Sequence, residues 1–274
     1  MSSSFSLTLT DLIIYPVKSC RGIHVSEALL TSQGLERDRE WMVVDPSGAF
    51  ITQREEPRMA LINTELTGDA LVVRGPALEA LVIPLEVRPM VLRSVQVWRH
   101  SLDALDEGPT AAEWFSNFLK RPVHLVRFPA DHRRLSNREW TGSIDAENRF
   151  SDAYPILLIS EESLADLNHR IGGTPLLMDR FRTNLVVAGG PAYIEDTAQT
   201  IQAADIEFRI IKPCTRCSIT ATNQQTAEVG VEPLKTLATY RRSQRPSGVV
   251  FGQNIVTIRG VGNRLRVGMT FVTD

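Results

Sequence analysis

Two cysteines spaced three residues apart, Cys214 and Cys217, form a paired-thiol motif in the segment Lys-Pro-Cys-Thr-Arg-Cys that begins at Lys212. Positive charge stabilises a thiolate, the form of cysteine that binds metal, and Lys212 and Arg216 flank the pair. The hydroxyl of Thr215 can bond to an anion or to a sulfur. The segment therefore predicts a turn that suits a soft metal held beside a phosphate.

Three other kinds of paired-cysteine site compete with this interpretation. A structural zinc site needs four ligands, and the five histidines all precede the motif without a zinc-site spacing, so zinc is disfavoured. A thioredoxin-like motif begins a helix, whereas this one lies between predicted strands at residues 206–211 and 218–221, which disfavours a disulfide oxidoreductase without excluding it. Two buried structural cysteines also stay open, because free cysteine often packs as a small apolar residue.

Several polar groups elsewhere are candidates for binding an anion. Lys18 and Ser19 follow a predicted strand and place a cation beside a hydroxyl, although an exposed loop lysine is the ordinary alternative. Arg39 ends a segment of alternating charge that begins at Gly34, and a similar segment covers residues 52–58; such patterns are typical of a solvated surface. Each of these signals is weak alone.

Two further pairs come late in the chain. Arg182 and Asn184 lie two residues apart at the start of a predicted strand, so both side chains are expected on one face, within reach of one ligand. Arginine suits bidentate contact with phosphate. Gly252 allows close approach of the backbone, and the amide of Asn254 can bond to a heterocycle.

Short runs of β-branched and aromatic residues, separated by turn residues, must position these groups. The predicted strands are residues 6–15, 41–45, 70–73, 91–98, 123–128, 156–159, 185–188, 206–211, 218–221 and 255–258. Many short strands favour a barrel or sandwich over a doubly wound sheet. Helices are predicted after a capping box at Thr110 and Glu113, after Ser160, and at residues 234–242 behind Pro233. The expected fold class is mainly β with a few α-helices (α+β).

The composition excludes several classes of function. Thirty Lys and Arg residues against 32 Asp and Glu leave a net charge of −2, which argues against a nucleic-acid-binding surface. Three cysteines do not suggest a disulfide framework, so reduced thiols and a cytoplasmic location are expected. The N-terminal residues lack the pattern of a signal peptide, and no apolar run approaches the length of a membrane span, so no membrane partner is expected.

The polar segment at residues 129–150 carries four arginines and no clear periodicity. It is either a linker between an N-terminal domain, residues 1–128, and a C-terminal domain, residues 129–274, or a loop over an anionic ligand, since loops often carry function. The sequence leaves both interpretations open.

Together and in this order, the motifs resemble a known family, that of proteins in which a MOSC (molybdenum cofactor sulfurase C-terminal) domain follows a β-barrel-like N-terminal MOSC domain. The resemblance covers residues 9–272 and is strongest to amidoxime-reducing components and to bacterial reductases of N-hydroxylated compounds. The motifs that carry it are Tyr15-Pro-Val-Lys-Ser-Cys, Gly34-Leu-Glu-Arg-Asp-Arg, Phe181-Arg-Thr-Asn, Lys212-Pro-Cys-Thr-Arg-Cys, Glu232-Pro-Leu-Lys-Thr-Leu and Phe251-Gly-Gln-Asn.

The resemblance implies a role for each matching residue. The second cysteine of the motif, Cys217, is expected to ligate molybdenum and to be the catalytic residue. The other positions are expected to bind the molybdenum cofactor, with Lys18 and Ser19 at the phosphate of its pterin: Lys18, Ser19, Arg39, Arg182, Asn184, Thr215, Arg216 and Asn254. Some relatives have Thr-Ser where this chain has Ala153 and Tyr154, so a contact there would use the backbone.

The implied activity is that of a molybdenum-dependent oxidoreductase, which reduces amidoximes, hydroxylamines and hydroxylated nucleobases by transferring oxygen to the metal. No pyridoxal phosphate, zinc or iron–sulfur cluster is expected in this chain. Some bacterial relatives carry a ferredoxin domain that is not part of this sequence, so electrons are expected from a separate protein of ferredoxin, cytochrome b5 or flavin reductase type. The alternative is a sulfur-carrier or cofactor-delivery protein that uses Cys217 to hold a persulfide or the cofactor.

Overall fold

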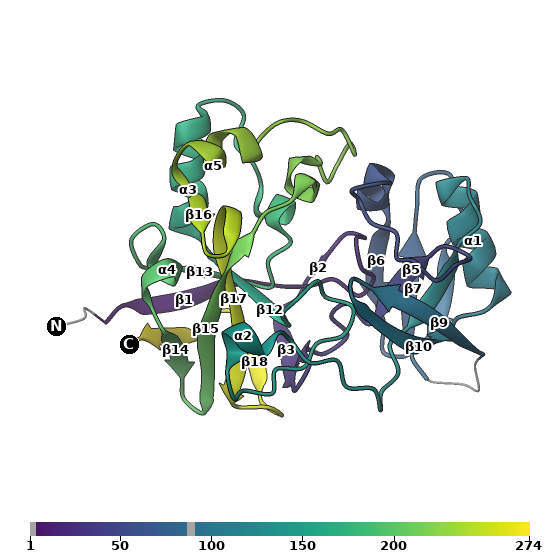
Figure 1. Ribbon diagram of the computed structural model, residues 1–274, viewed down its shortest axis with the longest axis horizontal. Helices are drawn as coiled ribbons and strands as arrows, with labels where there is room; N and C mark the ends of the chain where they lie inside the picture. The colour runs from purple at the N-terminus through teal and green to yellow at the C-terminus, as the bar shows by residue number, and fades with distance from the viewer. Residues whose placement is uncertain (1–3, 87–90) are drawn as a thin grey trace.

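The computed structural model describes residues 4–86 and 91–274 and has two lobes (Figure 1). Seven strands of its largest sheet close into a barrel, because β12 pairs with β17 as well as with β13. Around the barrel these strands are β12 (Ile156–Ser160), β13 (Leu185–Ala188), β1 (Ser6–Ile14), β19 (Thr270–Thr273), β14 (Thr200–Ala203), β15 (Ile206–Thr215) and β17 (Ser247–Arg259). A mainly β fold with a barrel was expected, and the structure confirms it.

The other lobe is built from two antiparallel sheets and one helix, α1 (Pro109–Leu119). Its larger sheet has the order β5 (Trp41–Val44), β11 (His124–Arg127), β10 (His100–Asp106) and β9 (Leu92–Val97). The smaller one is a meander of β6 (Asn63–Leu66), β7 (Ala70–Arg74) and β8 (Leu81–Pro84). Buried Trp114, Phe115 and Phe118 of α1 pack into the core between these sheets.

Short elements complete the fold and cover the barrel. The strands are β2 (Ile23–His24), β3 (Glu27–Thr31), β4 (Gly34–Leu35), β16 (Arg242–Gln244) and β18 (Arg264–Arg266). The helices are α2 (Arg138–Thr141), α3 (Glu161–Ile171), α4 (Ile194–Thr197) and α5 (Leu234–Tyr240), with 3-10 turns η1 (Pro57–Leu61), η2 (Met178–Phe181) and η3 (Ser218–Ala221). α3 and α5 lie together on one side of the barrel (Figure 1).

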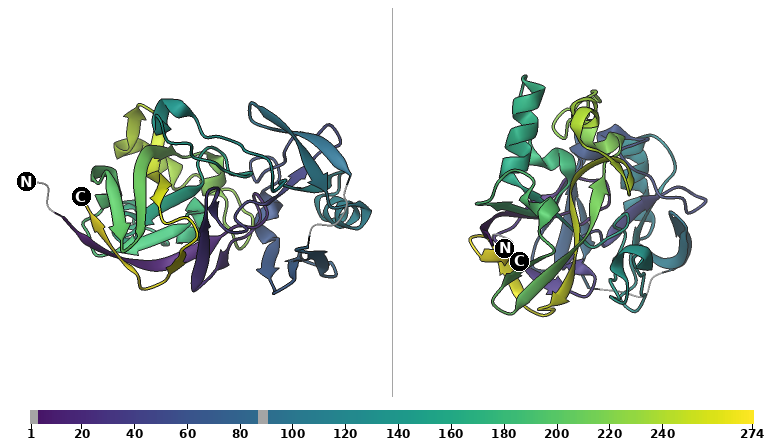
Figure 2. Two further views of the ribbon diagram at one scale, coloured as in Figure 1. Left: turned by 90° about the horizontal axis from the view of Figure 1, so that it is seen from below. Right: turned by 60° about the vertical axis from the view of Figure 1, so that its left-hand side comes forward.

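The first strands of the chain belong to the barrel lobe, as the two views in Figure 2 show for the N-terminal segment. β1 pairs with β13 and β19, and β3 pairs with β18 near the C-terminus. Residues 6–31 therefore contribute strands to the lobe that the C-terminal half builds. The division of the chain at residues 128 and 129 stays a prediction, and the sheet pairing crosses it.

Most predicted strands are present, and one prediction is wrong. Residues 218–221 form the 3-10 turn η3 rather than a strand, so the paired cysteines do not lie between two strands. β15 instead runs on as far as Thr215, with a register shift against β17 between Pro213 and Thr215. The hydroxyl of Thr220 bonds to the carbonyl of Cys217, at 2.9 Å, and this local bond favours the turn over an extended chain.

Of the two helix caps predicted from the sequence, one is confirmed and one is wrong. Ser160 caps α3 as expected, since its hydroxyl accepts a hydrogen bond from the Ser163 amide at 3.1 Å. The capping box at Thr110 is wrong: α1 begins at Pro109 behind Gly108, and Thr110 lies exposed inside the first turn. Pro favours the first position of a helix, and that preference placed the start one residue before the expected cap.

Alanine substitutions at Ser160 and Thr110 compare a true helix cap with a position that is not one. Ser160→Ala is expected to lower the free energy of unfolding by about 1–2 kcal/mol, because it removes the cap of a buried helix start. Thr110→Ala, at an exposed helical position, is expected to change it by less than about 0.5 kcal/mol. Urea denaturation of both variants checks this, and equal losses would contradict the capping assignment.

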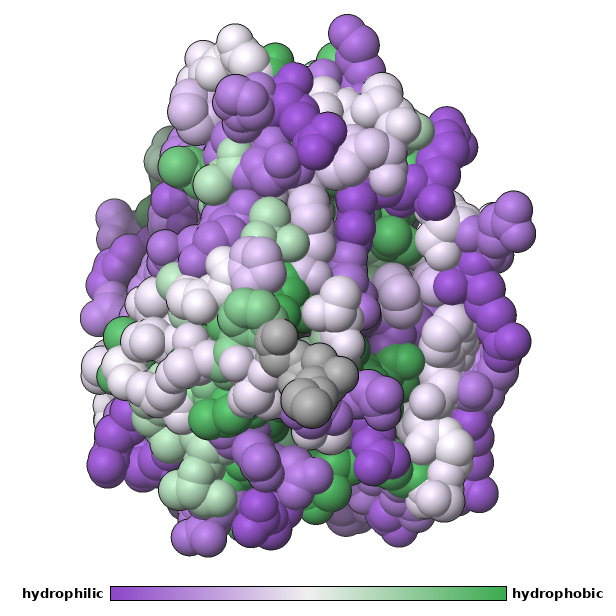
Figure 3. All heavy atoms as spheres, turned by 90° about the vertical axis from the view of Figure 1, so that its left-hand side faces the viewer, coloured by the Kyte–Doolittle hydropathy of each residue, from purple (hydrophilic) through white to green (hydrophobic). Residues whose placement is uncertain are grey.

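Among the described residues, no helix is long and apolar enough to cross a membrane. The face around the chain termini is a mosaic of hydrophilic side chains with small hydrophobic areas between them (Figure 3).

Candidate functional site

All nine residues predicted from the sequence line a single cavity of about 420 Å³, called the inner cavity below. They come from distant parts of the chain: the loops after β1 and β4, the end of η2, the start of β13, the end of β15 and the middle of β17. The residues are Lys18, Ser19, Arg39, Arg182, Asn184, Thr215, Arg216, Cys217 and Asn254. The structure thus brings the predicted set together, while the role of each residue stays a prediction.

Three of these residues have a strained backbone. Ser19, Arg39 and Arg182 have φ values of 67°, 47° and 55°, in the left-handed region that non-glycine residues rarely adopt. Such conformations are costly and are found preferentially at functional sites. The sequence suggested that Arg182 and Asn184 share one face of a strand. Arg182 is instead outside any regular strand, because it follows η2 with a left-handed backbone.

Two guanidinium groups lie on the ring of Tyr15. Arg39 is 4.2 Å and Arg182 4.4 Å from the ring centroid, and Arg39 also pairs with the buried carboxylate of Asp38 at 2.6 Å. Asp38 accepts a bond from the Tyr15 amide at 2.8 Å, which ties the arginine pair to the end of β1. Burial lowers the pKa of Arg182 to about 10, and the charge of Arg39 contributes to the same shift. An anion in the inner cavity would relieve this repulsion.

Lys18 is 5% exposed, and its amino group donates to the Phe150 carbonyl at 2.7 Å and to the Asp152 carboxylate at 2.5 Å. Burial lowers the pKa of Lys18 to about 8, although the charge of Asp152 and its hydrogen bond oppose the shift. The ammonium has one donor more than these two partners use. Ser19 places a hydroxyl next to it in the same cavity.

The two cysteines of the motif have different environments. Cys214 is partly buried, and its sulfur accepts a bond from the Arg216 guanidinium at 3.0 Å. Cys217 is exposed to the inner cavity, where the Arg54 guanidinium lies 3.7 Å from its sulfur. The sequence alone left the two thiols equivalent. In the structure both line the inner cavity, and Cys217 is the more exposed of the two.

The two asparagines make bonds to the protein itself. Asn184 is 1% exposed, donates to the Ile13 carbonyl at 3.0 Å, and accepts from the Leu157 amide at 3.2 Å. It therefore bonds to both β1 and β12, the strands on either side of β13, while it lines the cavity. Asn254 donates to the Lys212 carbonyl at 3.1 Å. Gly252 nearby is needed for close approach, because a Cβ there would lie 2.5 Å from the Ile159 side chain.

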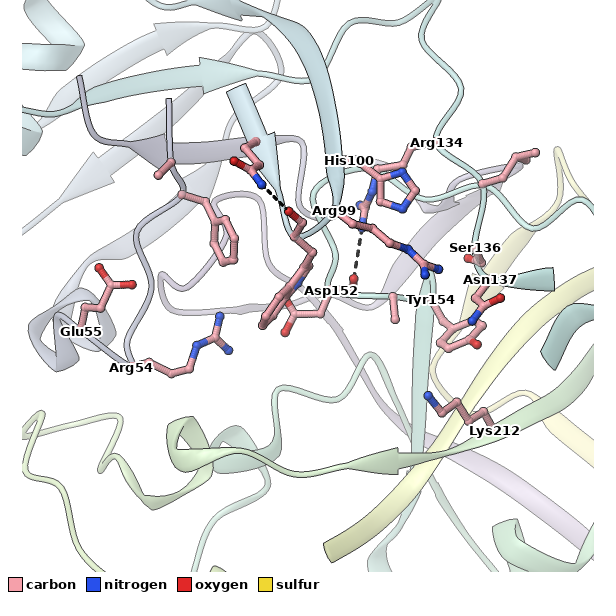
Figure 4. Close-up of a pocket in the computed structure, with 16 residues that line it drawn as sticks. Arg54, Glu55, Arg99, His100, Arg134, Ser136, Asn137, Asp152, Tyr154 and Lys212 are labelled. Carbon is pink, nitrogen blue, oxygen red and sulfur yellow. Dashed lines mark hydrogen bonds between the residues drawn. The ribbon is translucent and has the colours of Figure 1, made fainter. Parts of the chain in front are cut away.

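A second, wider cavity of about 900 Å³ opens beside the first (Figure 4) and is called the outer cavity below. The two share six residues: Arg54, Trp98, Asp152, Ala153, Tyr154 and Lys212. The sequence analysis had not singled out Arg54, Trp98 or Asp152. The alternating charges around Arg54 suggested a solvated surface. That interpretation is wrong for Arg54, which is partly buried and lies between the sulfur of Cys217 and the Trp98 ring.

The segment at residues 129–150 is ordered by its own contacts. The Arg134 side chain donates to the carbonyls of Ser151 at 2.8 Å and Asp152 at 3.1 Å, and α2 interrupts the segment. Residues 134–137 line the outer cavity. The segment therefore connects the lobes and also forms part of a cavity wall, so the two interpretations of the sequence are compatible.

The lining of the inner cavity fits a phosphate-bearing metal cofactor. The thiols of Cys214 and Cys217 line it, with Cys217 the more exposed. Five basic side chains also line it: Lys18, Arg39, Arg54, Arg182 and Lys212. Arg216 also lines it, and its buried Nε has no hydrogen-bond partner in the described chain. The described residues hold no group of three His, Cys, Asp or Glu side chains arranged for a metal. An exposed cysteine sulfur with surplus cations fits a metal whose other ligands arrive with an anionic cofactor.

Two family models match the chain. The MOSC N-terminal beta barrel domain matches residues 6–122, and the MOSC domain matches residues 145–270. Mitochondrial amidoxime reducing component 2 of Bos taurus is 35% identical over 243 residues, which are 85% of this chain and 72% of the relative. Mitochondrial amidoxime-reducing component 1 of Homo sapiens is 33% identical over 90% of this chain and 76% of its own length.

A solved structure, the YUAD protein from Bacillus subtilis, is similar over 100% of this chain and 98% of its own. Its sequence identity is 10% and its TM-score is 0.44. The family models and the sequence relatives show the family to which the chain belongs. The chain belongs to the family of MOSC-domain proteins that includes the mitochondrial amidoxime-reducing components.

Proposed function

We propose that the protein is a reductase of N-hydroxylated compounds that binds a molybdenum cofactor in the inner cavity. The observation that carries this proposal is the accessible Cys217 sulfur in a cavity lined by cations from separate segments. Relatives named amidoxime-reducing components support the reaction class. The substrate class proposed is that of amidoximes, hydroxylamines and hydroxylated nucleobases.

In this proposal the residues of the chain bind and orient. Cys217 provides the protein ligand of the metal, and Lys18, Arg39 and Arg182 neutralise the phosphate of the cofactor through charge-assisted hydrogen bonds. When bound, the cofactor supplies the redox-active metal that reduction of an N–O bond requires. Arg54 lies beside the sulfur of Cys217 and can donate to an oxygen of the substrate, since a guanidinium has five N–H donors.

The overall reaction consumes electrons that must come from another protein. An N-hydroxylated substrate takes up two electrons and two protons and yields the reduced nitrogen compound and water. We propose a separate electron donor of ferredoxin, cytochrome b5 or flavin reductase type, and a cytoplasmic location. Neither nucleic acid nor membrane is a proposed partner.

Turnover with a chemical reductant tests the function without the physiological donor. Protein made in a host that synthesises the cofactor is expected to convert benzamidoxime to benzamidine when reduced methyl viologen is supplied. Arg54→Lys should lower kcat by about tenfold, because an ammonium replaces a fork of donors beside the thiol. Protein with a full complement of molybdenum but no conversion would overturn the proposal.

The alternative is a sulfur-carrier or cofactor-delivery protein, and the exposure of Cys217 favours it equally. A persulfide carrier needs an accessible thiol that cations keep reactive. Mass spectrometry of the protein as purified distinguishes these cases: a mass increase of one sulfur on Cys217 without molybdenum supports the carrier. Molybdenum bound without turnover supports delivery.

A further inference from the structure

The outer cavity has a different chemical character from the inner one. At about 900 Å³ it exceeds the space that a single ring such as benzamidoxime needs, and it lies in the range of sites for larger ligands. The tip of the β9–β10 hairpin, Trp98 and Arg99, forms one wall. Residues 134–137 and Lys212 of β15 form others.

Aromatic rings line the outer cavity at its junction with the inner one. Trp98 is 47% exposed, its indole nitrogen donates to Asp152 at 3.2 Å, and its ring lies 5.2 Å from that of Phe50. The Arg54 guanidinium lies over Trp98 at 4.9 Å. A fixed, half-exposed indole beside a guanidinium is suited to stacking with a planar ring of a ligand.

Four basic side chains of the outer cavity have no carboxylate partner among the residues that the structure describes: Arg54, Arg99, Arg134 and Lys212. Arg134 donates instead to the backbone carbonyls of Ser151 and Asp152, which leaves the other three for a ligand. Of its two acids, Asp152 is held by Lys18 at 2.5 Å. Glu55 lies on the side of Arg54, while Arg99 and Lys212 lie toward Tyr154 (Figure 4). The end of the cavity near Tyr154 therefore carries uncompensated positive charge.

We infer that the outer cavity binds substrates that join a planar N-hydroxylated ring to a phosphate, such as an N-hydroxylated nucleoside monophosphate. The ring stacks at Trp98 with its N–O group toward Arg54 and Cys217, and the phosphate lies between Arg99 and Lys212. The N-hydroxylated part of this inference rests on the proposed function. The phosphate part rests on the unpaired cations and the size of the cavity.

Calorimetric titration with N4-hydroxycytidine and its 5′-monophosphate tests the inference by binding rather than by activity. The monophosphate is expected to bind at least about tenfold more tightly at low salt, and the preference should shrink as ionic strength rises. Arg99→Gln should reduce the preference about threefold to tenfold, and Arg99→Glu should remove it. Arg209→Gln provides the matched control, since Arg209 is exposed on β15 outside both cavities.

The outcomes separate this inference from the proposed function. Equal affinities for the two compounds, or a preference that Arg99→Glu leaves unchanged, would overturn the inference. If the preference depends on Arg99 but protein loaded with molybdenum reduces neither compound, the anion site stands and the proposed function fails. If both compounds are reduced and bind equally, the function stands and the anion site fails.

Discussion

Cys217→Ala is expected to lose more than about nine-tenths of its molybdenum, while Cys214→Ala keeps a near wild-type content. The physical reason is the difference in access, because the sulfur of Cys217 is exposed to the inner cavity and that of Cys214 is held by Arg216. Alanine cannot ligate the metal, so the Cys217→Ala variant would hold the cofactor only through its ionic contacts. Those contacts alone are expected to retain it poorly. Metal analysis of proteins made in a cofactor-synthesising host measures the effect.

The two variants control for one another, because both remove one thiol from the same turn. Circular dichroism and the urea midpoint verify that each variant folds. Equal molybdenum in the two variants would contradict the ligand assignment, and so would its absence from wild type. Loss from Cys214→Ala alone would mean that the partly buried cysteine is the ligand.

The barrel was predictable in class because local patterns report on it. Runs such as residues 185–188 have the composition of a fully buried strand, and β13 is buried along most of its length. The closure of the barrel was not predictable. It depends on β1 pairing with β13 and β19 and on β12 pairing with β17, and these partners lie far apart in the chain. Hydrophobic periodicity carries no information on such partners.

The inner cavity and the outer cavity differ in how well the sequence predicted them. Lys18, Arg39 and Arg182 stood in motifs that a family resemblance could identify, and all three line the inner cavity. Arg54 and Trp98 gave no such signal, because a charge run and a hairpin tip are both ordinary surface features. Their function depends on the approach of the lobes, which places the hairpin tip beside Asp152.

Lys18→Gln is expected to weaken retention of the cofactor about 10- to 100-fold, the range for loss of one hydrogen bond from a buried charged donor. Lys235→Gln, an exposed lysine on α5, is the control and should have no effect. Binding of inorganic phosphate to protein without the cofactor measures the same loss without any metal. Retention that Lys18→Gln leaves unchanged even at high ionic strength would contradict the phosphate role.

The same lysine gives the phosphate affinity a pH dependence. Burial lowers the pKa of Lys18 to about 8 in the free protein, so the ammonium loses its proton as the pH rises through about 8. Phosphate prefers the charged lysine, and its affinity should fall by up to about tenfold per pH unit above that point.

The unfolded chain keeps this proton up to a pH near the ordinary value of 10.5, so folding stability should rise with pH between about 8 and 10.5. Titrations in Lys18→Gln should show neither trend, and an affinity that stays constant across pH 8 in wild type would sink the assignment.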